Sequence, residues 1–105
     1  MPLTPTDHPV ALAKGDPWAV AFPMQVENSS PAGLVQVVAT YECVEDLDHP
    51  GQLADKSNAT AIAESNRALL ERAASAKFDA KGVDPEEGQH EGRPILRLHS
   101  YDLPA

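Results

Sequence analysis

The three side chains of a hydrolase triad occur together in the closing stretch "LRLHSYDL". His99, Ser100 and Asp102 occupy three of the four positions 99–102. In a serine hydrolase the imidazole takes the proton of the hydroxyl, and the carboxylate orients the imidazole, so both groups lie at hydrogen-bond distance from it. Whether these three residues can meet therefore depends on the backbone that carries them.

That backbone is predicted to be extended. The alternation in "ILRLHSYD" is typical of a last strand over residues 94–102. Consecutive side chains of a strand point to opposite faces, so we expect His99 on one face with Tyr101, and Ser100 with Asp102 on the other. Ser100 also lacks the flanking glycines of a nucleophile elbow. We therefore predict no catalytic residue, and the sequence favours a non-catalytic protein.

A second group of polar residues suggests ligand binding. Asn66 falls on the apolar stripe of a predicted helix, where a buried amide needs partners. In the ordinary structural interpretation, Asn66 bonds the backbone of a strand and Arg67 pairs with Glu64 or Glu71 of its own helix. In the alternative, an enzyme or binding protein holds a small anionic ligand with four side chains: Asn66, Arg67, Arg97 and His99.

The sequence indicates no metal site and no cofactor. The four histidines lie in separate segments without ligand spacing, and no glycine-rich motif cradles a phosphate. The single cysteine, Cys43, excludes an internal disulfide, and acidic neighbours disfavour its thiolate. We expect a quiet, partly buried thiol. Lone cysteine usage and the lack of a secretory signal favour the cytoplasm.

The charge of the chain restricts its partners. The formal net charge is −8; residues 1–55 hold eight acidic residues and one lysine, whereas residues 56–105 hold eight acidic and seven basic residues. Nucleic acids and anionic membranes would be repelled by the acidic half. No apolar run approaches the length of a membrane span. A basic protein partner is permitted.

The remaining elements follow from periodicity. Residues 18–26 and 34–40 read as two strands of a hairpin, with a further short strand over 9–13. Thr40 is placed to cap a short helix in "YECVEDL". A long helix is predicted over 58–81, ending at Gly82. Residues 1–8 are expected to be a disordered N-terminal segment of a single domain, 1–105.

These elements predict an α+β fold in which a small, mostly antiparallel sheet of three or four strands carries the long helix on one face. The central strand is apolar on both sides, and the sequence leaves open whether one helix covers the whole sheet. An uncovered apolar patch would be a binding surface. We therefore expect a small cytoplasmic protein that acts through association with a protein partner or as a homodimer.

Several short phrases resemble a known family. "VAFPMQV", a β-branched strand running into "ATYECVEDL", "NRALLERAASAKF" and the closing "ILRLHSYDL" are similar to a group of small bacterial proteins, domain of unknown function 1488. The resemblance extends over residues 18–103. It implies an α+β fold and brings no reaction, ligand or partner.

Overall fold

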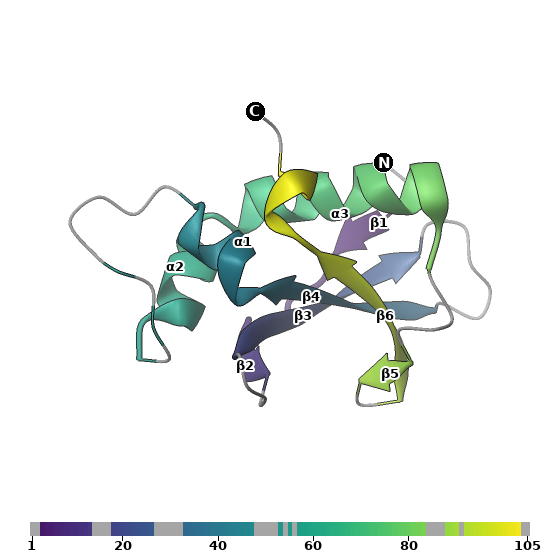
Figure 1. The fold of residues 1–105 in the computed structure, drawn as a ribbon. Helices are drawn as coiled ribbons and strands as arrows, with labels where there is room; N and C mark the ends of the chain where they lie inside the picture. The colour runs from purple at the N-terminus through teal and green to yellow at the C-terminus, as the bar shows by residue number, and fades with distance from the viewer. Residues whose placement is uncertain are drawn as a thin grey trace.

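A sheet with a long helix across one face organises the molecule (Figure 1). The structure, a computed structural model, describes residues 3–13, 18–26, 33–47, 53, 55, 57–83, 88–90 and 92–103. The strands formed by these residues are β1 (Leu3–Pro5), β2 (Ala11–Ala13), β3 (Ala19–Val26), β4 (Leu34–Thr40), β5 (Gln89–His90) and β6 (Arg93–Leu98). The helices are α1 (Tyr41–Glu45), α2 (Ala59–Ser65), α3 (Arg67–Lys81) and the 3-10 helix η2 (Ser100–Asp102).

The strand order is β1-β3-β4-β6-β5, and β2 also pairs with β3. β3 and β4 form the expected antiparallel hairpin, with Ala21 opposite Val38. β4 and β6 are parallel, with Val37 opposite Leu96. The α+β prediction is thus confirmed, and the mostly antiparallel sheet gains two short strands, β1 and β5, that the sequence did not indicate.

The N-terminal segment is a correction. Residues 1–8 were expected to be disordered, but Leu3–Pro5 forms β1 against β3, and Leu3 is fully buried. Leu3 is an apolar residue within a short, mostly polar stretch, and its side chain packs into the core. Its backbone N–H also donates to the buried Ser75 Oγ of α3 at 3.2 Å. A three-residue strand gives too weak a periodic pattern to be recognised without its partner.

Pro23 explains why β1 and β2 are separate strands. β1 pairs with Met24–Val26 and β2 with Ala19–Ala21, so neither pairs with the residues between. The Pro23 carbonyl accepts from the Thr6 hydroxyl at 2.9 Å, on the side of β3 that faces this gap. In a strand the N–H and C=O of one residue point to the same edge. The backbone N–H that Pro23 lacks would therefore point to this gap, where neither β1 nor β2 requires a hydrogen-bond donor.

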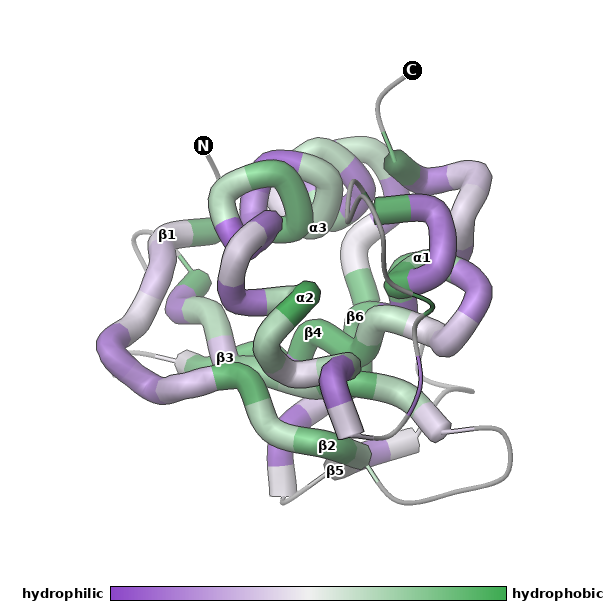
Figure 2. Tube along the Cα trace, turned by 90° about the vertical axis from the view of Figure 1, so that its left-hand side faces the viewer, coloured by the Kyte–Doolittle hydropathy of each residue, from purple (hydrophilic) through white to green (hydrophobic). Residues whose placement is uncertain are grey.

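The two faces of the sheet carry different apolar clusters. Val35, Val37 and Ala39 of β4 face the main core beneath the helices, together with Phe22. Figure 2 shows this arrangement from the side, with α3 above the strands. The opposite face carries a small cluster, Ala13, Ala21, Val38 and Ile95, each at most 8 % exposed. These four side chains are buried, so they form no exposed apolar patch on this face.

The helices begin and end close to the predicted positions, with one break. Thr40 caps α1, its hydroxyl accepting from the Cys43 N–H at 3.3 Å. Gly82 ends α3 with a positive φ of 68° and donates to the Phe78 carbonyl at 2.8 Å. The helix expected over 58–81 is two helices, α2 and α3, that meet at Asn66. Asn66 has φ −114° and ψ 19°, outside the helical region, although the sequence around it has no Gly or Pro.

The last strand is also shorter than predicted. β6 ends at Leu98, and Ser100–Asp102 coils into η2. The backbone N–H of His99 donates to Asp102 Oδ2 at 2.9 Å, and the Asp102 N–H donates to the His99 carbonyl at 2.9 Å. A carboxylate three residues ahead thus offers the chain a local partner that competes with an extended backbone. The expectation of a strand over residues 94–102 is wrong beyond Leu98.

Candidate functional site

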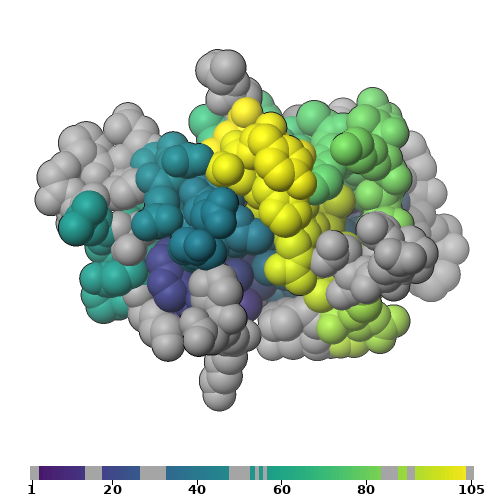
Figure 3. All heavy atoms as spheres, viewed as in Figure 1, coloured from purple at the N-terminus to yellow at the C-terminus, as the bar shows by residue number. Residues whose placement is uncertain are grey.

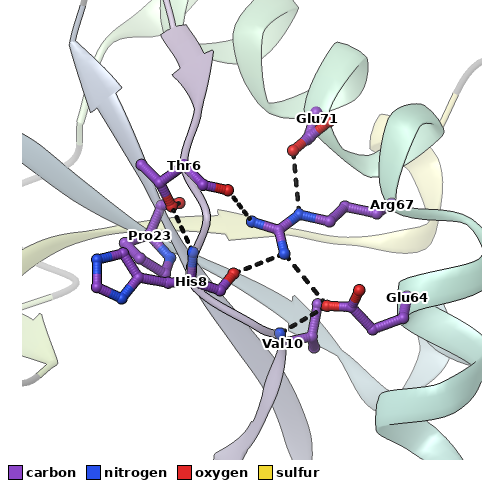
Figure 4. Close-up of polar contacts among 7 residues, drawn as sticks. All are labelled: Thr6, His8, Val10, Pro23, Glu64, Arg67 and Glu71. Atoms are coloured by element: carbon purple, nitrogen blue, oxygen red, sulfur yellow. Dashed lines mark hydrogen bonds and ion pairs between the residues drawn. The ribbon is translucent and has the colours of Figure 1, made fainter.

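Arg67, the first residue of α3, binds the segment between β1 and β2 (Figure 4). Its Nη1 donates to the His8 carbonyl at 2.6 Å and its Nη2 to the Thr6 carbonyl at 3.1 Å. Nε contacts Glu71 Oε2 at 3.1 Å, and Nη1 also contacts Glu64 Oε1 at 3.2 Å. We call this group of contacts the Arg67 clamp.

Two further contacts complete the Arg67 clamp. Glu64 Oε1 also accepts from the Val10 N–H at 2.7 Å, so this carboxylate holds both the guanidinium and the chain before β2. The guanidinium carbon lies 5.0 Å from the ring centre of Phe22, within the range of a cation–π contact. All three guanidinium nitrogens thus donate to protein acceptors. The arrangement fits a structural role better than the binding of an external anion.

The pairing of Arg67 with Glu64 and Glu71 agrees with the ordinary structural interpretation. Asn66 does not bond a strand in the contacts that we describe: its side-chain amide donates to the Ile62 carbonyl of α2 at 3.0 Å. Arg97 lies on β6, two strands away from β3 in the sheet order, and His99 follows the end of β6. Asn66 and Arg67 lie where α2 meets α3, whereas Arg97 and His99 lie at the end of β6, where Lys77 binds the Arg97 carbonyl. By their elements, the four residues of the ligand hypothesis belong to two regions.

A second charged side chain of α3 holds the C-terminal turn. Lys77 Nζ donates to Asp102 Oδ2 at 2.9 Å and to the Arg97 carbonyl of β6 at 2.6 Å. Burial alone would raise the pKa of Asp102, but the hydrogen bonds from Lys77 and the His99 backbone, with the charge of Lys77, lower the pKa below its usual value. We call these contacts the Lys77 clasp.

The Lys77 clasp engages the carboxylate of the three residues that resemble a triad. The Asp102 carboxylate binds Lys77 and the His99 backbone, and the His99 ring stacks on Tyr101 with ring centres 5.0 Å apart and an interplanar angle of 11°. Within the described part of the chain, no contact joins the Ser100 hydroxyl to the imidazole. The pleating argument fails because residues 100–102 coil, but the observed contacts still do not form a triad.

Cys43 is buried more deeply than the partly buried thiol that we expected. It is fully buried in α1, and burial, followed by the negative charges of Asp102 and Asp46, raises its pKa to about 12. A thiol with such a pKa carries almost no thiolate near neutral pH, so it is a poor nucleophile.

The α1 helix and η2 pack against one another and share one face of the molecule (Figure 3). Residues 42, 45 and 46 present exposed carboxylates, and Tyr101 is 76 % exposed. Tyr41 and His99 are half-buried beside them. We define the acidic–aromatic surface by these six residues: Tyr41, Glu42, Glu45, Asp46, His99 and Tyr101.

The aromatic members of this surface are held in place. Tyr41 meets Trp18 edge to face, with ring centres 6.2 Å apart and planes inclined by 66°. A hydrogen bond with Glu42 and the negative charge of that carboxylate raise the pKa of Tyr41 above its usual value. The His99 ring covers one side of Tyr101. The surface thus combines oriented rings with negative charge, which suits recognition of a cationic partner.

In the parts of the chain that the structure describes, no three His, Cys, Asp or Glu side chains are grouped as a metal ion would require. No helix among the described residues has the length and hydropathy to cross a bilayer.

Comparisons with known proteins add no assignment. No model of a protein family matches the sequence, no curated protein is similar to it, and no solved structure matches its fold. The resemblance to domain of unknown function 1488 stays a prediction.

The acidic–aromatic surface was not found from the sequence. Glu42 and Glu45 lie within the stretch expected to be a short helix, and Tyr101 was expected on the face of a strand. The available signal was Asp102, a turn-forming residue three positions after His99 and two before Pro104, which would have indicated a turn instead of a strand. Even that signal does not place the turn beside α1.

Proposed function

We propose that this protein is non-catalytic and acts by binding another protein through the acidic–aromatic surface. The observation that carries the proposal is the exposed Tyr101 ring, stacked on His99 and adjoining a helix with exposed carboxylates. Tyrosine is enriched among the residues that dominate binding energy at protein interfaces, because a rigid ring buries a large area at low entropic cost.

The internal use of the reactive side chains supports this choice over catalysis. Arg67 donates to two carbonyls and two carboxylates, and Lys77 donates to one carbonyl and one carboxylate. The Cys43 thiol is buried, and its pKa is raised. These contacts support protein binding better than they support a small anionic ligand held by Asn66, Arg67, Arg97 and His99. Arg67 and His99 contact different parts of the chain. A cytoplasmic location, where the single thiol stays reduced, is part of the proposal.

Co-purification from the native cells tests the proposal. The tagged wild-type protein should retain a partner in stoichiometric amount, and Tyr101→Ala should lose it. Leu53→Ala is the matched control, because Leu53 is 88 % exposed and lies outside the surface, so its variant should keep the partner.

Two results would contradict the proposal. One is a partner retained equally by Tyr101→Ala and by the wild type. The other is turnover of a substrate by the wild-type protein that Asp102→Asn or Cys43→Ser abolishes while the fold is kept. A homodimer, the other form of association that the sequence allows, would appear as a concentration-dependent mass in sedimentation.

A further inference from the structure

The partner of the acidic–aromatic surface can be narrowed further, on the assumption that the proposed function is correct. One route to association is the addition of a strand to a sheet edge. Helix α3 binds one backbone group of β1 and one of β6: Ser75 accepts from the N–H of Leu3, and Lys77 donates to the carbonyl of Arg97. The other two outer strands, β2 and β5, are only three and two residues long, and very short edge strands resist pairing. The acidic–aromatic surface is therefore the better candidate for the contact.

Charge argues against a second copy of the chain at this surface. In a symmetric dimer the same patch of both copies meets at the axis. Glu42, Glu45 and Asp46 of one copy would then approach the same carboxylates of the other. Like charges at an interface are unfavourable, and the whole chain, at −8, adds to the repulsion.

We propose that the occupant is a basic segment of another protein, with an arginine side chain on the open ring face of Tyr101. His99 covers one face of that ring at 5.0 Å, and the ring is 76 % exposed. A guanidinium stacks on an aromatic face more readily than an ammonium, because it is planar and less strongly hydrated. The carboxylates of α1 and Asp46 attract the remaining positive charges of the segment and speed its approach.

Peptide binding tests this inference without knowledge of the natural partner. The probe is a fluorescent peptide of alternating glycine and arginine, compared with peptides in which lysine or glutamate replaces arginine. Fluorescence anisotropy at low salt should show binding in the order arginine, lysine, glutamate. Tyr101→Ala should weaken arginine-peptide binding by about three- to fivefold, the size of an exposed cation–π contact, and Tyr101→Phe should preserve it.

A charge-matched pair of variants separates this surface from the general charge of the chain. Glu42→Gln combined with Glu45→Gln should weaken binding by about tenfold, since two nearby charges are lost. Asp7→Asn combined with Asp79→Asn removes two exposed carboxylates that lie outside the surface, and it should change binding by less than about twofold.

Three outcomes would overturn the inference. The first is a Kd for the arginine peptide above about 1 mM. The second is an equal loss of affinity in the two double variants. The third is that the arginine and lysine peptides bind equally well, and that Tyr101→Ala binds both as well as the wild type does. Failure here is distinguishable from failure of the proposed function. If Tyr101→Ala still loses the co-purified partner, the surface binds protein and only the basic character of the partner is wrong.

Discussion

The Arg67 clamp and the Lys77 clasp are two solutions to the same problem at opposite ends of α3. Each uses a cation of the helix to hold a segment far away in the chain. Arg67 reaches two carbonyls and two carboxylates, whereas Lys77 reaches one carbonyl and one carboxylate. A guanidinium has five donors in a planar fork, and an ammonium is a compact point charge.

The segments that they hold differ in what they expose. The Arg67 clamp covers Phe22 of the core and holds the segment whose Thr6 hydroxyl donates to the Pro23 carbonyl. The Lys77 clasp holds η2 so that Tyr101 projects into solvent. The comparison indicates that the first region completes the fold and the second presents a surface. Four measurements test this distinction.

The largest effect is expected for Arg67→Ala. The side chain is 16 % exposed, and its loss leaves Glu71 and two carbonyls without their donor. We expect the free energy of unfolding to fall by about 3 kcal/mol in urea titrations. Arg72→Ala, an exposed arginine of the same helix, is the control and should cost less than about 0.5 kcal/mol. Equal losses would mean that the clamp does not hold the fold.

A smaller effect is expected at the Lys77 clasp. A double-mutant cycle of Lys77→Met and Asp102→Asn should give a coupling energy of about 1 kcal/mol, because the pair is well formed but only partly buried. Chemical unfolding of the four proteins supplies the measurement. A coupling energy near zero would show that the backbone hydrogen bonds of η2, and not the ion pair, hold the turn.

The same pair should respond to pH. The folded pKa of Asp102 lies below its usual value of about 4, so its contribution to stability is present above that value. It is lost as the pH falls through the lower pKa of the folded state, where the carboxyl takes up a proton. The stability difference between the wild type and Asp102→Asn should therefore be constant from pH 7 to about 5 and then shrink. A difference that grows in acid would contradict this assignment.

The smallest effect on stability is expected for Tyr101→Ala. The ring is 76 % exposed, so the free energy of unfolding should change by less than about 0.5 kcal/mol even though partner binding is lost. Thermal unfolding of the purified variant checks this. A loss of several degrees would place Tyr101 with the residues that build the fold and would weaken the case for a binding surface.

Sequence reasoning succeeded where a pattern is repeated. The strands at Ala19–Val26 and Leu34–Thr40, the helix ending at Gly82 and the Thr40 cap all follow from periodicity or from one residue with a specific backbone preference. It also anticipated that Arg67 would pair with the glutamates three before and four after it, because these positions adjoin on a helix.

It failed where a contact distant in sequence, or a local side-chain bond, decides the backbone. Leu3–Pro5 is a strand because β3 and Ser75 lie beside it, and Ser100–Asp102 coils because Asp102 binds the His99 N–H. The break at Asn66 also escaped prediction, since propensities favour one continuous helix there. None of these features produces a repeating pattern of apolar and polar residues within its own segment, so periodicity could not predict it.

The sequence alone determined the fold class, the central hairpin, the main helix and the negative charge, since each depends on composition or on neighbours within a few residues. Tertiary structure alone decided that Arg67 closes over the N-terminal segment and that η2, which carries Tyr101, packs beside α1. These pairs are separated by more than fifty residues, and only the packing of the helices on the sheet brings such distant side chains together.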